Sequence, residues 1–485
     1  MSRRLSDLVK REVGADPEIT GVTADSRKVR PGYLFAALPG STVDGRTFAA
    51  KAVAAGAVAV LSGEDIPDLG VPVIVSSDPR RAYALAARAF WGVQPPVVVA
   101  VTGTNGKTSV AAFCRQIFNQ LGHKAASMGT LGVRATGPGL DVQLTPPTGL
   151  TTPDAADVAE LMAKLADLGV THLALEASSH GVDQRRLDGA DLTVAGFLNL
   201  TQDHLDYHGT MGVYREAKLR LFNALLPRGA TAVLNSDSDA YEAFAGAAVT
   251  CGQSVMSVGA AGQGLTLLAR TPTPEGQALK IGCKGEIYDV RLPLVGGYQA
   301  SNVLVAAGLC IAAGEDPALV MSALETLEGA PGRLQHIGAG PRGGEAYVDY
   351  AHTPDGLETV LRALRPHVEG RLIVVFGAGG DRDKAKRPLM GAAASGHADI
   401  AIVTDDNPRS EDPAEIRAQV LAGAPGAREI GDRRKAIQAA TALMTRGDVL
   451  VVAGKGHEQG QTIAGVVHPF DDVTEVATAL EPIRG

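Results

Sequence analysis

The sequence predicts an α/β protein of about three domains built on parallel β-sheets. Its 485 residues correspond to roughly three domains at the usual ~100–200 residues each. Short apolar, β-branched runs each break into a small polar loop, and helix-like stretches separate them. Such continuous apolar strands are typical of parallel sheets covered by helices on both faces. Open parallel sheets bind ligands beyond the carboxyl ends of their strands, so we expect these polar loops to carry the function.

The first strand-like runs are residues 33–37, 57–61 and 71–75, and they end at the stiff linker Gln94-Pro95-Pro96. A second break, Gly329-Ala-Pro-Gly332, follows a helical pattern over 316–327. These two breaks predict an N-terminal domain of residues 1–94, a central domain of 95–330 and a C-terminal domain of 331–485.

The central domain opens with a strand at 97–101, the loop TGTNGKTS at 102–109 and a helical stretch at 110–121. Glycines let backbone N–H groups surround phosphate oxygens, the lysine neutralises charge, and the hydroxyl after it ligates Mg²⁺. The match to the usual phosphate loop is partial, because Val101 stands where that loop has a glycine. We still expect a nucleotide-phosphate site. Its residues are Gly103, Thr104, Asn105, Gly106, Lys107, Thr108 and Ser109.

Two later loops of the central domain add candidate metal ligands. Glu176 ends the strand 173–176, and a carboxylate there suits a magnesium ion that also holds phosphate. The segment Asp203-His-Leu-Asp-Tyr-His208 follows the strand 195–200. His204 and His208 are four residues apart, but the glutamate of a zinc helix is missing, so zinc is not expected and a structural His204 remains open. Lys218 lies in a helix-like stretch where spacing alone indicates only a solvated lysine.

In the C-terminal domain, strands at 372–376, 400–403 and 449–452 precede the loops GAGGDRDK, TDDNPR and AGKGHE. The alternation of strand and polar loop is the same as in the central domain. We therefore expect a second parallel sheet whose loops bind a ligand.

The composition excludes several classes of protein. Lys+Arg 45 against Asp+Glu 53 gives a net charge of −8, and aromatics are 4%, so a nucleic-acid partner is not expected. The longest apolar stretches, 52–61 and 303–314, fall short of the ~20 residues that span a bilayer. The first twenty residues contain no apolar signal core. We expect a cytoplasmic protein without a membrane partner.

The four cysteines lie far apart and predict neither a disulfide framework nor a zinc site: Cys114, Cys251, Cys283 and Cys310.

Ten motifs in order resemble the Mur ligase family of peptidoglycan synthesis over nearly the whole chain. They are Asp25-Ser26-Arg27, TGTNGKTS, EASSHG at 176–181, DHLDYHG at 203–209, Ala217-Lys218, PGR at 331–333, DYAHTPD at 349–355, GGDRD at 379–383, DNPR at 406–409 and GKGHE at 454–458. The resemblance is strongest to members that add meso-2,6-diaminopimelate to UDP-N-acetylmuramoyl-L-alanyl-D-glutamate.

The resemblance implies an N-terminal UDP-binding domain, a central P-loop-type ATPase domain with a parallel sheet, and a C-terminal Rossmann-like domain that binds the amino acid. It implies an ATP-dependent ligase that forms an acyl phosphate, releases ADP and phosphate, and serves cell-wall synthesis and hence cell shape and division. The small-molecule partners are then ATP, UDP-N-acetylmuramoyl-dipeptide and meso-diaminopimelate, with Mg²⁺ as cofactor, and we expect a monomer.

The resemblance also implies residue roles. Beyond the phosphate loop, ATP contacts are implied for Asn302, Arg333, Asp349 and His352, whereas Gln299 departs from the asparagine common in the family. Contacts with the UDP-muramoyl-dipeptide are implied for Ser26, Ser41, Thr42, Thr151, Thr152, Ser178, Gln184 and Arg186. Diaminopimelate contacts are implied for Arg382, Asp406, Asn407, Pro408, Arg409, Gly454 and Glu458. The metal set is Thr108, Glu176, His204 and Lys218, and the catalytic set is Lys107, Glu176, His204 and Lys218, with Lys218 carbamylated by CO₂.

Arg409 gives the sharpest expectation about substrate choice. Diaminopimelate carries a distal carboxylate, which a planar guanidinium pairs with bidentately, whereas lysine has none. A lysine-adding Mur ligase or a folylpolyglutamate synthetase is the near alternative, and neither needs such a contact. A P-loop NTPase acting as a regulatory switch is the distant alternative, and it leaves the DNPR segment without a role.

Overall fold

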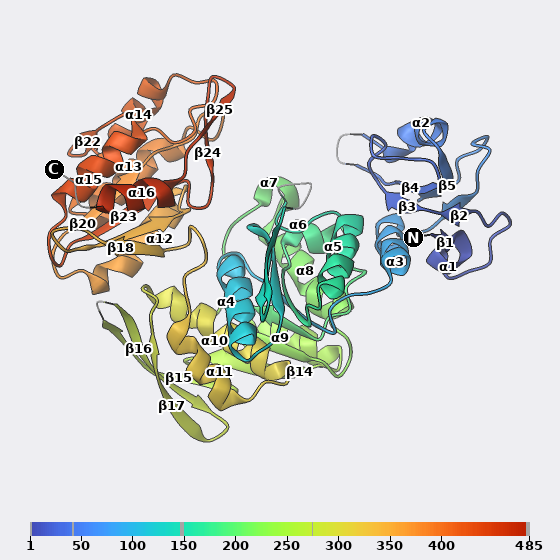
Figure 1. Cartoon of the computed structure of the whole chain (residues 1–485), viewed down its shortest axis with the longest axis horizontal. Helices are drawn as coiled ribbons and strands as arrows, with labels where there is room; N and C mark the ends of the chain where they lie inside the picture. Colours follow the sequence, from blue (N-terminus) through green and yellow to red (C-terminus); the bar gives the residue numbers. More distant parts are fainter. Residues whose placement is uncertain (1, 41–42, 146–149, 274, 482–485) are drawn as a thin grey trace. The chain divides into compact units, whose positions relative to one another are not determined.

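The computed structural model describes residues 2–40, 43–145, 150–273 and 275–481 (Figure 1). The chain divides into two compact units, Met1–Thr266 with Leu304–Val320, and Leu267–Val303 with Met321–Gly485. In the described part of the chain, no helix combines the length and the apolar character needed to cross a membrane.

The N-terminal region forms a four-stranded parallel sheet in the order β3-β4-β5-β6 and a small antiparallel pair, β1-β2. Two apolar clusters pack on this sheet, one of them centred on helix α3. The elements are β1 (Arg3–Arg4), α1 (Leu5–Val9), β2 (Glu18–Ile19), β3 (Gly21–Thr23), β4 (Tyr33–Ala37), a 3₁₀ turn (Gly45–Phe48), α2 (Ala49–Ala54), β5 (Ala57–Ser62), β6 (Val73–Val75) and α3 (Pro79–Trp91).

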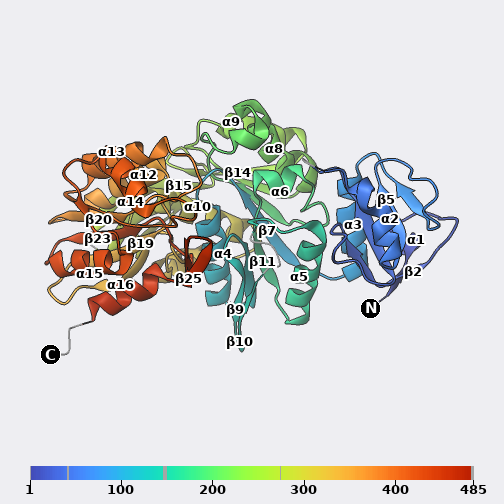
Figure 2. The ribbon, with the colours of Figure 1, turned by 90° about the horizontal axis from the view of Figure 1, so that it is seen from above.

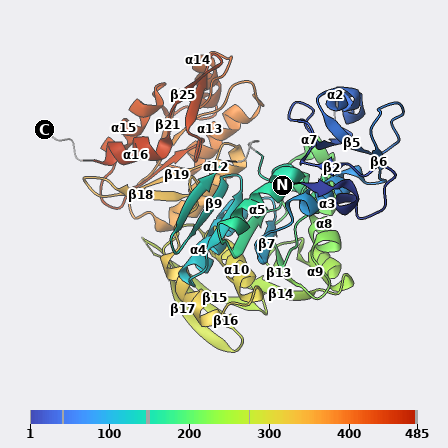
Figure 3. The ribbon, with the colours of Figure 1, turned by 45° about the vertical axis from the view of Figure 1, so that its right-hand side comes forward.

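The large central sheet runs in the order β10-β9-β8-β11-β7-β12-β13-β14-β15-β16-β17. Its middle strands, from β8 through β11, β7, β12 and β13 to β14, pair in parallel. Helix α4 lies on one side of these strands and α5 on the other (Figures 1 and 3). Residue Gly196 of β12 faces α10 so closely that a Cβ would lie 3.3 Å from Val305 and Leu309.

The first elements of this region are β7 (Val97–Thr102), α4 (Lys107–Gln120), β8 (Ala125–Gly129), β9 (Gly132–Gly137), β10 (Leu140–Leu144), α5 (Ala155–Asp167), β11 (His172–Glu176), α6 (Ser179–Asp183), β12 (Val194–Phe197), α7 (Leu205–His208) and α8 (Met211–Arg220). A π-helical turn (Leu221–Leu225) follows α8. The remaining ones are β13 (Thr231–Asn235), α9 (Tyr241–Thr250), β14 (Ser254–Gly259), β15 (Leu265–Thr273), β16 (Gly276–Cys283), β17 (Glu286–Leu292), α10 (Gly297–Ala312), α11 (Pro317–Ala323) and a 3₁₀ turn (Leu324–Thr326).

The C-terminal sheet has the order β18-β19-β23-β20-β21-β22 and is parallel except for β18. Alternate residues of β20 point into two separate apolar clusters, one with α12, α13 and α14 and one with α15 and α16. Figure 2 shows the strands between these two helical layers. The alternation is that of a parallel sheet buried on both faces.

Its elements are β18 (Gln335–Ala339), β19 (Glu345–Asp349), α12 (Pro354–Leu364), a 3₁₀ turn (Arg365–His367), β20 (Leu372–Phe376), α13 (Lys386–His397), β21 (Ile400–Val403), α14 (Pro413–Leu421), β22 (Arg428–Glu429), α15 (Arg433–Leu443), β23 (Val449–Ala453) and α16 (Asp472–Leu480). A hairpin of β24 (Gly460–Ile463) and β25 (Val466–Pro469) precedes α16.

The predicted α/β class with parallel sheets is confirmed, and most predicted strands lie within two residues of the observed ones. The predicted strand 195–200 is too long, because β12 ends at Phe197 and Asn199 turns away to bond the phosphate loop. The helix predicted at 316–327 is shorter, ending at Ala323 before a 3₁₀ turn. All four cysteines are free thiols.

Candidate active site

The loop between β7 and α4 has the geometry of a phosphate-binding turn. Gly106 adopts φ 92°, a left-handed conformation that favours glycine, and the next residue begins α4. Asn199 braces the loop from the end of β12, because its side chain accepts from the Asn105 N–H at 2.9 Å and donates to the Asn105 carbonyl at 3.1 Å. The start of α4 therefore presents backbone N–H groups and its positive dipole end toward an anion.

Two lysine amines meet at one carbonyl of this loop. Lys107 Nζ donates to the Gly103 oxygen at 2.9 Å, and Lys218 Nζ donates to the same oxygen at 2.7 Å. Lys218, on α8, is 1% exposed. Burial, and then the charge of Lys107, lowers the pKa of Lys218 well below its ordinary value. Residue spacing alone indicates a solvated lysine here, whereas the structure buries Lys218 against the phosphate loop.

Glu176 lies beside the same loop, at the carboxyl end of β11. Its Oε2 accepts from the Thr108 hydroxyl at 3.0 Å, and its Oε1 accepts from the Thr130 N–H at 2.9 Å. Gly129 makes room for it, because a Cβ there would lie 2.0 Å from Glu176 Oε1. The hydroxyl and the carboxylate are hard oxygen ligands of the kind that Mg²⁺ prefers.

His204 is less buried than the other predicted metal ligands. It precedes α7 with φ 52°, and its Nε2 lies 3.4 Å from Asp203 Oδ2. Its ring stands 6.3 Å from the ring of Tyr214, and Lys218 Nζ is 4.5 Å from that same ring. Tyr214 thus links His204 to Lys218. The pKa of Tyr214 is raised to about 12 by burial, so its hydroxyl stays protonated.

The residues expected near the muramoyl-dipeptide form one connected group. Thr151 Oγ1 lies 3.0 Å from Thr130 Oγ1, next to Glu176. Thr152 Oγ1 lies 2.9 Å from Ser178 Oγ, and the Thr152 carbonyl accepts from Arg186 at 2.6 Å. The members of the group are Thr151, Thr152, Ser178, Gln184 and Arg186, and Arg186 also donates to the Gln184 side chain at 2.7 Å. Ser178 additionally caps α6 by accepting from the Gly181 N–H.

Ser26 lies apart from that group, on the wall of a cavity of about 1230 Å³. The same cavity is lined by Asp154 and by Tyr83, whose hydroxyl donates to Asp154 Oδ1 at 2.5 Å. Ser41 and Thr42, also expected near the uridine diphosphate, lie outside the described residues.

In the second unit, Asn302 is buried on α10 and donates from Nδ2 to Gln299 Oε1 at 3.0 Å. Gln299 is itself 1% exposed. The residue that departs from the family pattern therefore orients the predicted adenine ligand.

Arg333, Asp349 and His352 form a second cluster in this unit. The Arg333 guanidinium lies over the ring of Tyr350, at 4.7 Å. Asp349 accepts from the Leu334 and Ala351 N–H groups, each at 2.7 Å, although burial raises its pKa. The His352 ring packs 4.6 Å from Tyr350. Sequence reasoning missed Tyr350, which lies inside the DYAHTPD motif.

The DNPR and GKGHE loops are joined by hydrogen bonds. Asn407 Nδ2 donates to Glu458 Oε2 at 2.9 Å, and Asn407 Oδ1 accepts from Lys455 Nζ at 3.1 Å. Lys455 is 0% exposed, and burial lowers its pKa. Gly454 lies against Asp406, because a Cβ there would stand 2.5 Å from Asp406 Oδ2. Lys455 is a second residue that sequence reasoning missed.

Arg409 follows Pro408 with φ 54° and donates from Nη1 to the Gly380 carbonyl at 2.7 Å. The glycines at 379 and 380 allow this, since a Cβ on Gly379 would lie 2.8 Å from Arg409 Nη1. Arg382 is exposed in the loop before α13. The structure thus places all the residues predicted to contact the distal centre of the amino acid on adjoining loops at one end of the C-terminal sheet.

Three family models match the chain. They are described as "Mur ligase family, catalytic domain" over residues 18–91, "Mur ligase middle domain" over 101–310 and "Mur ligase, glutamate ligase domain" over 332–456.

Curated relatives match over the full length. The UDP-N-acetylmuramoyl-L-alanyl-D-glutamate–2,6-diaminopimelate ligase of Caulobacter vibrioides is 72% identical over 485 residues and covers 100% of both chains. The protein of the same name from Brucella melitensis is 51% identical, over 98% of this chain and 96% of its own.

Solved structures agree with these matches. A solved structure of a UDP-N-acetylmuramoyl-L-alanyl-D-glutamate–2,6-diaminopimelate ligase has a TM-score of 0.75 at 36% identity, and the match covers 99% of each chain. MurF ligase from Thermotoga maritima in complex with ADP shares the fold, with a TM-score of 0.61 at 18% identity over 95% of this chain and 96% of its own.

Proposed function

This chain belongs to the Mur ligase family, and from that premise we propose that the clusters described above are its ATP, metal, UDP-muramoyl-dipeptide and diaminopimelate sites. The protein is an ATP-dependent ligase that adds meso-2,6-diaminopimelate to UDP-N-acetylmuramoyl-L-alanyl-D-glutamate. It acts in peptidoglycan precursor synthesis, and we propose that it does so as a cytoplasmic monomer.

The reaction first joins two anions. The γ-carboxylate of the D-glutamate attacks the γ-phosphorus of ATP, the bond from that phosphorus to ADP breaks, and an acyl phosphate forms. Lys107 holds the loop that cradles the phosphates, and the Thr108 hydroxyl with Glu176 offers oxygen ligands for Mg²⁺. When bound, Mg²⁺ screens the repulsion between the phosphate and the attacking carboxylate.

The amine of diaminopimelate, in its neutral form, then attacks the acyl carbon. The attacking nitrogen loses one proton to solvent, the tetrahedral intermediate breaks its bond to the phosphate oxygen and expels phosphate, and an amide remains. Keeping water away from the acyl phosphate is the main demand on the protein at this stage, because hydrolysis would waste the ATP.

Carbamylation of Lys218 is part of this proposal. The amine attacks CO₂, a C–N bond forms, one proton leaves to solvent, and a carbamate anion results. Only the neutral amine reacts, and the low pKa of the buried Lys218 supports its neutrality. The anion would offer Mg²⁺ a carboxylate-like ligand near Glu176 and His204.

The choice of diaminopimelate rests on one observation, the placement of Arg409 beside the Asn407–Glu458 pair. The guanidinium would pair with the distal carboxylate, and Glu458 would accept from the distal ammonium. Bound lysine would leave the guanidinium without its partner, a loss of roughly 1–3 kcal/mol or more for a charged group.

A phosphate-release assay with single omissions tests the proposed activity. We expect release only when ATP, Mg²⁺, the UDP-muramoyl-dipeptide and diaminopimelate are all present. Steady nucleotide hydrolysis without an amino acid would instead indicate a P-loop NTPase and contradict the proposal.

A further inference from the structure

A group of metal-binding side chains lies at the end of the central sheet opposite the phosphate loop. His172 is the first residue of β11, whose last residue is Glu176. His123 belongs to the connection between α4 and β8, and Glu315 to the connection between α10 and α11. Four strand steps separate His172 from Glu176, about 13 Å at 3.3 Å per residue. The group is therefore separate from the ATP and Mg²⁺ site.

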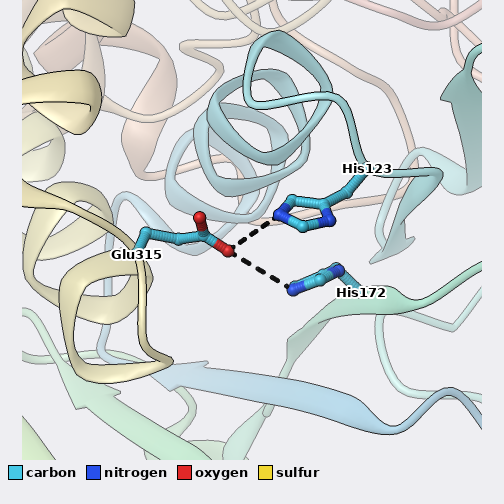
Figure 4. A group of neighbouring side chains, drawn as sticks. All are labelled: His123, His172 and Glu315. Carbon is cyan, nitrogen blue, oxygen red and sulfur yellow. Dashed lines mark ion pairs between the residues drawn. The ribbon is translucent and has the colours of Figure 1, made fainter.

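The two histidines converge on one carboxylate oxygen (Figure 4). Nε2 of His123 lies 3.0 Å from Glu315 Oε1, and Nε2 of His172 lies 3.5 Å from the same atom. One ligand atom from each residue lies within 4.8 Å of the others. Two imidazole nitrogens and one carboxylate oxygen are a ligand set that proteins use for zinc.

Nε2 is the nitrogen of His172 that faces Glu315, and the hydrogen bonds around the ring indicate whether Nε2 carries a proton or a lone pair. Thr171 Oγ1 lies 2.8 Å from His172 Nδ1, and the Thr171 hydroxyl donates to the Lys124 carbonyl at 3.3 Å. We assign the Thr171 hydroxyl proton to the Lys124 carbonyl, so that the hydroxyl oxygen accepts from Nδ1–H and the lone pair lies on Nε2.

A lone pair that faces a carboxylate is electrostatically unfavourable unless a cation lies between them. With its lone pair on Nε2, His172 brings no proton to this contact. A metal ion supplies the missing positive charge and uses the lone pair as a ligand, while Thr171 acts as the outer partner that fixes the tautomer of a metal-binding histidine.

The surroundings suit a metal that enters from solvent. The Phe118 ring packs 4.5 Å from the His172 ring and gives the site an apolar wall. The His172 side chain is 9% exposed, whereas the His123 side chain is 33% exposed. The site therefore has a fixed inner ligand and an open side, as an entry path requires.

We propose that His123, His172 and Glu315 bind a zinc-class divalent transition metal ion, with water completing the coordination. Imidazole ligands favour such metals over Mg²⁺ and Ca²⁺. The ion would fasten the end of α4, the start of β11 and the loop after α10 to one another. Its role would be structural, because the group holds the ends of α4 and β11 that lie away from Lys107 and Glu176.

The test uses the full chain, stripped of metal with a chelator and titrated with Zn²⁺ by calorimetry. We expect a site of micromolar affinity or tighter, and Zn²⁺ should raise the melting temperature. Co²⁺ in its place should give the intense visible bands of a tetrahedral site. Glu315→Gln and His123→Gln should each weaken Zn²⁺ binding by at least about tenfold, and Thr171→Val, which removes the outer partner, by roughly 10-fold or more.

Two controls separate this site from other histidines. His336→Gln removes one half of a surface pair with Glu345, 2.6 Å apart, and should leave Zn²⁺ affinity unchanged. Titration in a His204→Gln background removes the histidine nearest the proposed Mg²⁺ site, and the high-affinity event should remain.

Absence of Zn²⁺ binding to the wild-type chain would overturn the proposal, and so would equal affinity in wild type and Glu315→Gln. Circular dichroism would show whether each variant is folded. If His123→Gln were unfolded, the near-isosteric Glu315→Gln would decide the question.

Discussion

Gly129→Ala tests how the metal-binding carboxylate is held. Gly129 ends β8, and its φ lies outside the left-handed region, so the backbone accepts alanine. The new methyl group would meet three atoms of the Glu176 side chain, at 2.0 Å, 2.3 Å and 2.4 Å. The neighbour is a buried side chain held by hydrogen bonds, so Glu176 must leave its position.

The magnitude follows from the bonds that the displaced carboxylate loses. Two of these bonds come from Thr130, whose N–H donates to Glu176 at 2.9 Å and whose hydroxyl donates to it at 3.2 Å. Hydrogen bonds to a charged group contribute about 1.5–3 kcal/mol each, so both together give about 3–6 kcal/mol. Even the low end corresponds to roughly a 100-fold drop in the fraction of molecules whose Glu176 occupies its wild-type position, since 1.4 kcal/mol is tenfold in an equilibrium constant. We expect kcat to fall by at least that factor.

The assay is phosphate release at saturating substrate concentrations, with the melting temperature measured alongside. Gly246→Ala is the matched control, because Gly246 lies in α9 of the same unit and a Cβ there meets nothing within 4 Å. That variant should keep full activity and gain about 0.5–1 kcal/mol of stability. Wild-type activity in Gly129→Ala would refute the role given to Glu176, and so would a crystal structure of the variant with Glu176 undisplaced.

Four further predictions concern the other clusters. Arg409→Met should lower kcat/KM for diaminopimelate by roughly 10–100-fold, because a lost contact of this kind is worth about 1–3 kcal/mol and 1.4 kcal/mol is tenfold. The kcat/KM for lysine should hardly change. An unchanged ratio of the two kcat/KM values would count against the distal-carboxylate contact. Lys218→Ala should lower kcat by roughly 100-fold or more, and wild-type-like activity would reject the carbamate. Because burial lowers the pKa of Lys218, its amine stays neutral to a lower pH than the amine of an exposed lysine, so CO₂ uptake, followed by gentle mass measurement, should extend to a lower pH than for an exposed lysine and be lost as the pH falls further; uptake that rises with acidity would contradict this. Gln299→Ala should raise the KM for ATP roughly 5–10-fold with kcat nearly unchanged, because the Asn302 side chain loses the hydrogen bond that it donates to Gln299, and a drop in kcat alone would argue against a positioning role.

The sequence was sufficient for the fold class and for the loops that carry the chemistry. Apolar runs such as 372–376 end in polar loops, and burial on both faces of a parallel sheet explains both features at once. The phosphate loop was recognisable despite Val101, because it stands between a strand and a helix.

The supporting residues were not predictable in the same way. Gly129 is required because Glu176, from the neighbouring strand, fills the space where a Cβ would lie. The residues around Gly129 in the sequence do not predict that contact. Asn199 was hidden inside a run that resembles a strand, although an asparagine in such a run is itself a signal of a strand end. Buried Lys455 is adjacent to predicted site residues, yet its partner Asn407 is 48 residues away in the sequence.

The charges of the site are a further feature that the composition does not predict. The net charge of −8 indicates nothing about anionic substrates, because binding depends on a few local groups. Lys107 and Lys218 meet at one carbonyl oxygen, and their mutual repulsion contributes to the lowered pKa of Lys218. Only the folded chain brings these two amines together.

The ratio of kcat/KM for meso-diaminopimelate to that for L-lysine, measured by phosphate release with ATP, Mg²⁺ and the UDP-muramoyl-dipeptide, tests the account most directly. A site built around Arg409 and Glu458 predicts a preference for diaminopimelate of roughly 100-fold or more, because lysine leaves the Arg409 guanidinium without the carboxylate that it would pair with. Equal efficiency with the two amino acids, or activity with lysine alone, would contradict it.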